Sequence, residues 1–320
     1  MFAYILYTLI GATLVLVGAD KLTDGAVGLA ERFGISEMVI GLTIVAFGTS
    51  LPEFVVSLLA CISNDASTTA LSVSNIVGSN LFNTLLIAGA SAAIAPIAIT
   101  KGTVRKDIPL SLMASIVLSC LALDTFVSGG NTNVLTRGDG LVLLCFFAVF
   151  MAYSFRLAKQ KETGSTSNPM SSTRIAMFIV LGLVALIGGG ELFVEGACSI
   201  ARAAGVSEAV IGLTLVAGGT SLPELATSIV AARKGQSALA IGNVVGSNIF
   251  NIFFILGVCS TVKPLSVIGL GTVDFAVLTG SALLFWLFSC TSYKLSRWEG
   301  WTMMLAYALY LWWLIINKNI

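Results

Sequence analysis

The sequence predicts an all-α integral membrane protein, with ten transmembrane helices in two inverted-topology five-helix repeats. The chain of 320 residues is 57% hydrophobic and only 10% charged, whereas soluble domains carry about 25% charged residues. Apolar runs long enough to cross the hydrocarbon core of a bilayer recur along nearly the whole chain. An eight-residue stretch that begins at Ala46 is nearly repeated 171 residues later, from Ala217.

The apolar segments define the expected helices in order. The first has no basic segment before it and no clear cleavage site, so we expect it to be a span and not a signal peptide. The longest polar stretch, 156–174, follows the fifth helix and is typical of a flexible linker. The predicted domains are a first repeat at 1–158, a cytoplasmic linker at 159–173 and a second repeat at 174–320. The expected helices are 3–19, 38–62, 70–95, 108–127, 138–157, 174–194, 208–232, 238–262, 270–290 and 298–316.

Two motifs recur in both halves. The first is Ala46-Phe47-Gly48-Thr49-Ser50-Leu51-Pro52-Glu53, matched by Ala217-Gly218-Gly219-Thr220-Ser221-Leu222-Pro223-Glu224. The second is Ser74-Asn75-Ile76-Val77-Gly78-Ser79-Asn80-Leu81-Phe82-Asn83, matched by Gly242-Asn243-Val244-Val245-Gly246-Ser247-Asn248-Ile249-Phe250-Asn251. With five spans in each half, the second half must enter the membrane from the opposite side, and the repeats are inverted.

The first motif predicts a broken helix that offers oxygen ligands. Pro52 has no N–H and clashes with the carbonyl of Gly48, so we expect the carbonyls of residues 46–49 to be poorly paired within the helix. Unpaired carbonyls in hydrocarbon need a partner, and a dehydrated cation is one. Side-chain oxygens follow the same pattern in both halves: Thr49, Ser50, Glu53, Asn75, Ser79 and Asn83, and Thr220, Ser221, Glu224, Asn243, Ser247 and Asn251.

The candidate ligands are carboxylate, amide, hydroxyl and backbone carbonyl oxygens, and they include no imidazole or thiolate. Hard cations such as Ca²⁺ and Na⁺ favour oxygen ligands, and carboxylates inside a membrane are functional by default. Two carboxylates neutralise one Ca²⁺, and the same oxygens could hold several Na⁺, which gives a mechanism for competition between the ions. An intramembrane enzyme with Ser50 or Ser221 as nucleophile is disfavoured, because the chain has no histidine and no lysine near either motif.

The two motifs together resemble the α-1 and α-2 repeats of the sodium/calcium exchangers in the cation/Ca²⁺ exchanger (CaCA) superfamily, most of all its prokaryotic members. The resemblance implies a secondary active antiporter, not an enzyme, that exchanges Na⁺ for Ca²⁺ by alternating access. It implies Ca²⁺ ligands at Glu53, Glu224, Thr49 and Thr220, and Na⁺ sites that use Ala46, Ser50, Ser79, Ala217, Ser221 and Ser247. Asn83 and Asn251 would line the central position, with Asn75 and Asn243 behind the ligands.

The resemblance also implies how the exchanger moves and what crosses the membrane. The first and sixth helices, 3–19 and 174–194, would slide against the rest. A 3:1 ratio of Na⁺ to Ca²⁺ would make exchange electrogenic, and Ca²⁺ efflux is the expected direction. Because Asn251 stands where some potassium-dependent relatives have Asp, K⁺ dependence is disfavoured. Gly218, opposite the aromatic Phe47 of the first copy, is expected to loosen the packing behind the second site.

The expected partners are Ca²⁺, Na⁺ and the lipid bilayer, without a cofactor, an obligate protein partner or a nucleic acid, since the net charge is only +1. Ca²⁺/H⁺ or other cation/Ca²⁺ antiport on the same fold remains the alternative, and a cation channel is a less favoured one. The positive-inside rule favours both termini outside and the linker inside a multi-pass cell membrane, as in a bacterial inner membrane. The C-terminal aromatics are expected to face the lipid or to form an interfacial belt: Trp298, Trp301, Tyr307, Tyr310, Trp312 and Trp313.

Overall fold

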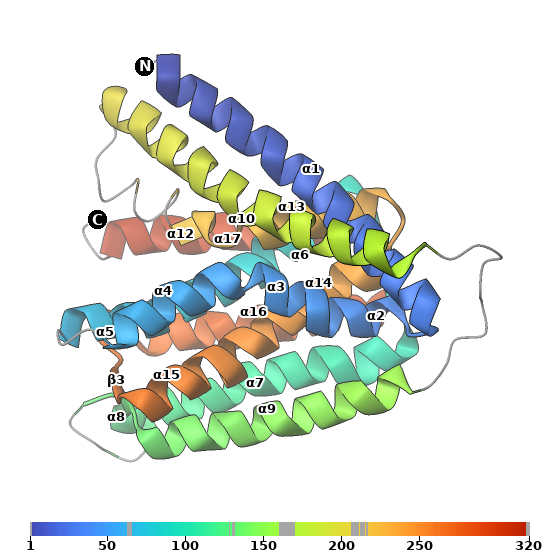
Figure 1. Ribbon diagram of the computed structural model, residues 1–320. Helices are drawn as coiled ribbons and strands as arrows, with labels where there is room; N and C mark the ends of the chain where they lie inside the picture. The colour runs from blue at the N-terminus through green and yellow to red at the C-terminus, as the bar shows by residue number, and fades with distance from the viewer. Residues whose placement is uncertain are drawn as a thin grey trace.

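The computed structural model is a bundle of helices, to which the described residues add four very short strands (Figure 1). It describes residues 2–62, 66–127, 129, 132–159, 170–205, 211, 215 and 217–317. Within these ranges, seven helices are long and apolar enough to cross a membrane, and an eighth is added if one bent pair counts as a single span. Most of the predicted linker and the beginning of the predicted helix 208–232 lie outside the described residues.

Helices α1 (Phe2–Phe33) and α10 (Ser172–Ala203) are much longer than the sequence predicted. The expected ends at residues 19 and 194 are wrong. The charged turn after residue 19 stays helical, and its acids Asp20 and Asp24 pair with Lys234 of the other half. A helix of 32 residues is about 48 Å long and exceeds the roughly 30 Å hydrocarbon core, so its charged turns can lie at the interface.

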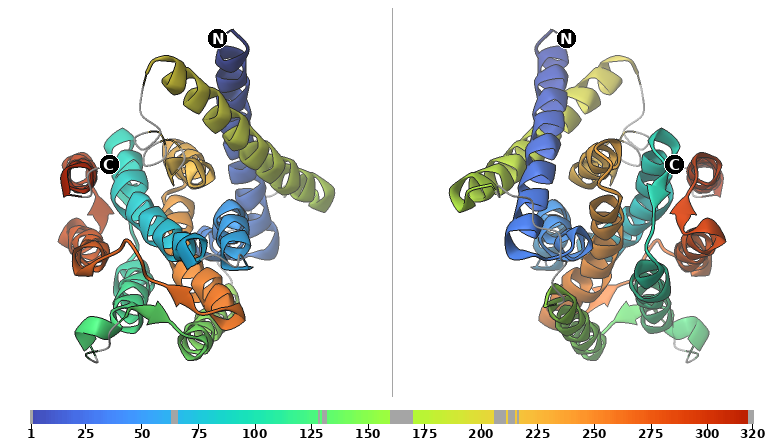
Figure 2. Two further views of the ribbon diagram at one scale, coloured as in Figure 1. Left: turned by 90° about the vertical axis from the view of Figure 1, so that its left-hand side faces the viewer. Right: turned by 90° about the vertical axis from the view of Figure 1, so that its right-hand side faces the viewer.

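The two long helices pack against each other and lie across one side of the bundle (Figures 1 and 2). Glycines make this approach possible: a Cβ added to Gly18 would lie 2.8 Å from the carbonyl oxygen of Gly182, and one on Gly189 would lie 2.7 Å from Cβ of Leu14. Since Gly11 meets Gly189 and Gly18 meets Gly182, the helices run antiparallel.

The second predicted helix is broken in the middle, as its proline predicted. It consists of α2 (Glu37–Ile40), η1 (Gly41–Val45) and α3 (Ala46–Thr49), followed by α4 (Leu51–Ile62) after a bend of 48°. The described part of its counterpart includes α12 (Ala217–Gly219) and α13 (Leu222–Arg233). Ser50 and Ser221 occupy the two breaks with almost the same backbone angles, φ −82° and ψ 7° against φ −92° and ψ 8°.

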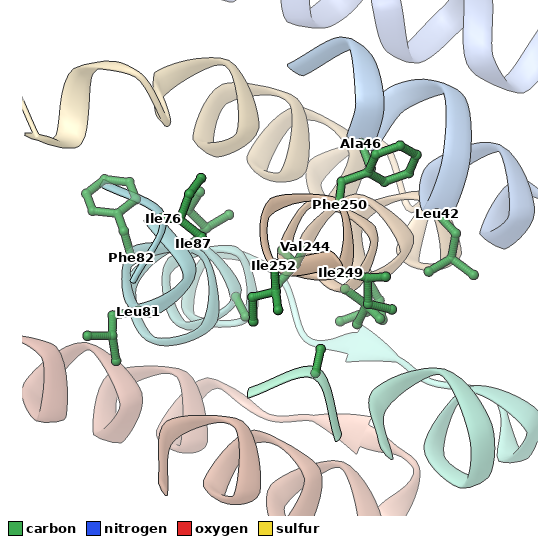
Figure 3. Packing of buried hydrophobic residues seen from close by; sticks show 14 of the residues in the cluster. Leu42, Ala46, Ile76, Leu81, Phe82, Ile87, Val244, Ile249, Phe250 and Ile252 are labelled. Carbon is green, nitrogen blue, oxygen red and sulfur yellow. The ribbon is translucent and has the colours of Figure 1, made fainter. Parts of the chain in front are cut away.

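Two further long helices form the centre of the bundle. One runs through α5 (Ala66–Leu81), η2 (Phe82–Ile87) and α6 (Ala88–Ile94). The other runs through α14 (Ser237–Ile249), η5 (Phe250–Leu256) and α15 (Gly257–Val262). Figure 3 shows Leu81, Phe82, Ile249 and Ile252 of these two helices among the buried hydrophobic residues. Each has a widened π-helical stretch that begins at a matching phenylalanine, where π-helical turns often mark functional sites.

The remaining helices flank this centre. They are η3 (Thr103–Asp107), α7 (Ile108–Ala122), the short α8 (Asp124–Val127), α9 (Arg137–Ala158), α16 (Thr272–Ser292) and α17 (Arg297–Asn317). Strand β1 (Ile97–Ala98) pairs antiparallel with β4 (Lys294–Leu295), and β2 (Val134–Leu135) pairs with β3 (Leu265–Ser266). Both strand pairs join the two halves of the chain.

Two tyrosine–aspartate pairs tie the outer helices together. The Tyr153 hydroxyl donates to Oδ1 of Asp107 at 2.7 Å, and the Tyr310 hydroxyl donates to Oδ1 of Asp274 at 2.8 Å. Both aspartates are buried. Tyr310 is half-buried and turns its hydroxyl inward to Asp274, whereas Trp298 is exposed. In each pair the tyrosine hydroxyl provides the hydrogen-bond donor that a buried carboxylate needs.

Candidate cation site

The two motif carboxylates lie close together in the middle of the bundle. Glu53 and Glu224 occupy the first turns of α4 and α13, and both are 0% exposed. The Ser221 hydroxyl donates to Oε1 of Glu53 at 2.8 Å, and the Ser50 hydroxyl donates to Oε1 of Glu224 at 2.9 Å. Each serine thus binds the carboxylate of the other broken helix, and the two breaks form one site.

The central helices add hydroxyl and amide groups to this site. The Ser79 hydroxyl lies 3.3 Å from Oε1 of Glu53 and 2.9 Å from the Ser221 hydroxyl. Nδ2 of Asn251 donates to Ser79 at 3.2 Å. In the other half, Ser247 lies near the Glu224 carboxylate, although its hydroxyl forms no hydrogen bond of good geometry with a described residue. The second motif therefore contributes from both halves.

Thr49 and Asn243 connect the first break to the second half. The Thr49 hydroxyl lies 3.1 Å from the carbonyl oxygen of Val45 and 3.2 Å from Oδ1 of Asn243. Nδ2 of Asn243 donates to the backbone carbonyl of Glu224 at 3.3 Å and to Ser228 at 2.9 Å. Asn243 is thus placed behind the two broken helices, where its amide orients groups of both. Its counterpart Asn75 is only half-buried.

Two serines that the motif analysis did not select hold these asparagines. Ser228 accepts from Asn243, and Ser57 accepts from Nδ2 of Asn75 at 3.4 Å. Ser57 and Ser228 are 0% exposed and lie one helical turn after Glu53 and Glu224. Their equal spacing from the two glutamates is a sequence signal that could have revealed them.

One backbone expectation is wrong. The carbonyl of Ala46 was expected to be poorly paired, but it accepts from the backbone N–H of Ser50 at 3.0 Å, because the helix keeps its geometry up to the break. Ala217 lies at the start of α12. Loose packing was expected at Gly218, but the ring of Phe82 occupies this space, since a Cβ on Gly218 would lie 3.2 Å from it.

Several buried oxygens of the site have lone pairs that the described protein groups do not use. They are Oε2 of Glu53 and Glu224, Oδ1 of Asn83 and Asn251, and the hydroxyls of Thr220 and Ser247. Leaving such groups without partners is costly, and a pair of buried carboxylates is costlier still. Carboxylate, amide and hydroxyl oxygens are the ligands of hard cations. The arrangement can therefore bind dehydrated Ca²⁺ or Na⁺.

A cavity of about 450 Å³ opens beside this site. It lies between α10 and the two broken helices, where Pro52, Thr220 and Pro223 line one wall and Glu191 and Glu195 line the other. Thr220 is one of the residues predicted to bind the cation. The cavity therefore reaches the site from the side of α10.

Comparison with known proteins agrees with this geometry. A family model described as sodium/calcium exchanger protein matches residues 3–156 and 174–316. The sodium/calcium exchanger MaX1 of Methanosarcina acetivorans is 32% identical over 96% of this chain and 97% of its own length. The inner membrane protein YrbG of Escherichia coli is 35% identical over 80% of this chain and 79% of its own.

A solved structure of the sodium-calcium exchanger NCX_Mj superposes with a TM-score of 0.83 at 33% sequence identity, covering 99% of each chain. The family match spans both halves and leaves out only the short terminal segments and the region of the predicted linker. It includes both broken helices and both central helices. The chain therefore belongs to the sodium/calcium exchanger family of membrane antiporters.

Proposed function

We propose that this protein exchanges Na⁺ for Ca²⁺ across a membrane by alternating access. The observation that carries the proposal is the reciprocal pairing of Ser221 with Glu53 and of Ser50 with Glu224. It gathers two carboxylates from two broken helices at a buried point. A divalent cation neutralises both carboxylates, and Na⁺ ions that take the same oxygens compete with it.

The proposed ligands follow the predicted assignment. Ca²⁺ binds the carboxylates of Glu53 and Glu224, with carbonyl oxygens of Thr49 and Thr220. Na⁺ binds on either side, at Ala46, Ser50 and Ser79 and at Ala217, Ser221 and Ser247, and Asn83 and Asn251 line the centre. The free carboxylate and amide oxygens support this assignment, as does the contact of Ser79 with both Glu53 and Ser221.

We also propose ten spans in two inverted five-helix repeats, with domains at 1–158 and 174–320 and a linker at 159–173. Three reciprocal contacts support this symmetry. Gly18 meets Gly182 in an antiparallel pair. Strand β1 pairs with β4, and β2 pairs with β3, so each connection of one half meets the non-equivalent connection of the other. The Tyr153–Asp107 pair recurs as Tyr310–Asp274.

The position of the α1–α10 pair supports the proposal of alternating access. The two helices are joined to each other through close glycine contacts, and outside their own interface they contact chiefly α13 and α2. We propose that the pair moves as one body, closing the cavity beside Glu191 and opening a path on the opposite face. Such a movement leaves the carboxylates in place and changes only which face they meet.

We further propose that both termini lie outside and that the linker is cytoplasmic, because thirteen of the seventeen Lys and Arg residues then fall on the inner side. The expected setting is a multi-pass cell membrane, with Ca²⁺ efflux as the net direction. Exchange of three Na⁺ for one Ca²⁺ would move one net positive charge per cycle, because three positive charges cross in one direction and two in the other.

Uptake of ⁴⁵Ca²⁺ into proteoliposomes tests the proposal. An outward Na⁺ gradient, with Na⁺ inside, is expected to drive uptake with or without K⁺, and an inside-positive potential is expected to speed it, because one net positive charge leaves for each Ca²⁺ that enters. Uptake that responds to a pH gradient and ignores the Na⁺ gradient would instead establish Ca²⁺/H⁺ antiport. Ion current without any counter-ion requirement would establish a channel.

A further inference from the structure

The two faces of the bundle differ in how the α1–α10 pair is held. On one face, the ammonium of Lys234 lies 2.6 Å from Oδ1 of Asp20 and 2.6 Å from Oδ1 of Asp24. Lys234 follows α13, whereas the two aspartates belong to α1. The same ammonium donates to the backbone carbonyl of Asp20 at 3.2 Å. One lysine of the broken-helix half thus binds three oxygens of the long helix.

The opposite face carries the same acids without the lysine. At the repeat offset of 171 residues, Glu191 and Glu195 of α10 are the counterparts of Asp20 and Asp24, and the sequence has Ser63 in place of Lys234. Glu191 and Glu195 are exposed at the wall of the 450 Å³ cavity. Neither forms an ion pair within the part of the chain that the structure describes. The two pairs of acids thus occupy equivalent sequence positions, but only the first pair has a lysine at the matching position of the other half.

We infer that Lys234 is a gate residue, which holds α1 against α13 and keeps its own face closed while the cavity on the other face is open. The inference rests on the proposed exchange by alternating access. For the Lys234 face to open, the α1–α10 pair must move away from α13, and the three contacts of Lys234 must break. The absence of a basic counterpart at position 63 makes the two end states unequal in energy.

The local structure fixes both partners of this contact. The backbone N–H of Lys234 caps α13 by donating to the carbonyl of Val230 at 3.0 Å, so the lysine starts from a rigid helix end. Lys21 also contacts Asp20 and Asp24, but it belongs to α1 itself and moves with it. Partial burial lowers the pKa of Lys234, but its hydrogen bonds to Asp20 and Asp24 outweigh this and raise it, so the lysine stays charged near neutral pH.

The free energy expected from the contacts of Lys234 is small enough for the gate to open reversibly. The side chains involved are 31% to 40% exposed, and a partly exposed ion pair shifts an equilibrium by about fivefold or less. Such a contribution biases the population of two states without preventing their exchange. It is also screened by salt, which provides a second way to weaken it.

Hydrogen–deuterium exchange of the full chain in lipid nanodiscs tests this inference without relying on transport. In Lys234→Ala, amides of α1 between Asp20 and Phe33 are expected to exchange about fivefold faster than in the wild type. Asp20→Asn/Asp24→Asn is expected to behave in the same way, and 1 M KCl is expected to reduce the difference. Lys234→Arg, which keeps the charge, should retain protection. Unchanged protection in Lys234→Ala would overturn the inference.

Arg233→Ala is the matched control, because it removes the same charge one residue earlier from an exposed side chain. It is expected to exchange like the wild type, and equal acceleration in both variants would reduce the effect to bulk surface charge and overturn the gate. In proteoliposomes, Lys234→Ala is expected to change the turnover of Na⁺-driven Ca²⁺ uptake at least twofold, with Ca²⁺ binding to the detergent-solubilised protein unchanged. Should the wild type fail to transport Ca²⁺, the proposed function would fall while the exchange measurements still decide the role of Lys234.

Discussion

The hydroxyl of Ser221 lies 2.8 Å from Oε1 of Glu53, although 168 residues separate them in the chain. Ser50 and Glu224 repeat the contact in reverse at 2.9 Å. Because each break supplies the donor for the other's carboxylate, neither half can form the site alone. This reciprocity is the structural basis of the exchange that we propose, and it makes the individual residues testable.

Removal of either carboxylate charge is expected to abolish Ca²⁺ uptake. Glu53→Gln and Glu224→Gln keep the size of the side chain and remove one of the two charges that would neutralise a divalent ion. Proteoliposome uptake of ⁴⁵Ca²⁺ should fall at least about a hundredfold, because truncating one charged partner costs about 3 kcal/mol or more. Glu31→Gln, at an exposed acid of α1, should retain uptake. Normal uptake by either glutamine variant would remove these residues from the site.

Loss of the Ser221 hydroxyl is expected to weaken Na⁺ more than Ca²⁺. Ser221→Ala removes a contact to both Glu53 and Ser79 and one proposed Na⁺ ligand, so the Na⁺ concentration needed for half-maximal Ca²⁺ release should rise about three- to tenfold, the range of about 1 kcal/mol. Ser289→Ala is the control, since its buried hydroxyl bonds only within its own helix, to Phe285 at 2.7 Å. Equal Na⁺ dependence in the two variants would contradict the assignment.

Neighbouring glycines of α10 should respond very differently to the same added methyl group. Gly189→Ala places Cβ 2.7 Å from Cβ of Leu14 and forces α1 and α10 apart, which is expected to cost about 1–3 kcal/mol. A methyl group on Gly188 would meet no described atom within 4 Å and should be neutral or stabilise the helix by up to about 1 kcal/mol. Thermal unfolding in detergent would measure both, and equal midpoints would show that the helices tolerate a wider spacing.

The two tyrosine–aspartate pairs are expected to contribute equally to stability. Tyr153→Phe and Tyr310→Phe each leave a buried aspartate oxygen without its donor, at an expected cost of about 1–3 kcal/mol. Tyr7→Phe, at a side chain 39% exposed, should change stability little. Unfolding midpoints in detergent provide the measurement. A loss in only one of the two pairs would mean that the halves are not equivalent at this position.

Local sequence features predicted much of this structure. Pro52 and Pro223 predicted breaks, and the structure places a break one helical turn before Glu53 and before Glu224. The predicted ends of α1 and α10 were wrong, because each charged turn in the sequence was interpreted as the end of a helix. Asp20 pairs with Lys21 of the same helix and with Lys234 of another segment, so this charged turn has partners inside the folded protein.

The sequence by itself determined that the chain lies in a membrane, that its halves repeat and that its oxygen-bearing side chains are concentrated in two motifs. These properties follow from composition, periodicity and proline chemistry, which act over a few residues. Only the tertiary structure decided that Ser50 faces Glu224 and not Glu53, that Ser57 and Ser228 hold the asparagines, and that Lys234 reaches α1. Those contacts join segments that are distant in the chain, and the packing of whole helices, through their glycine faces, sets which of them meet.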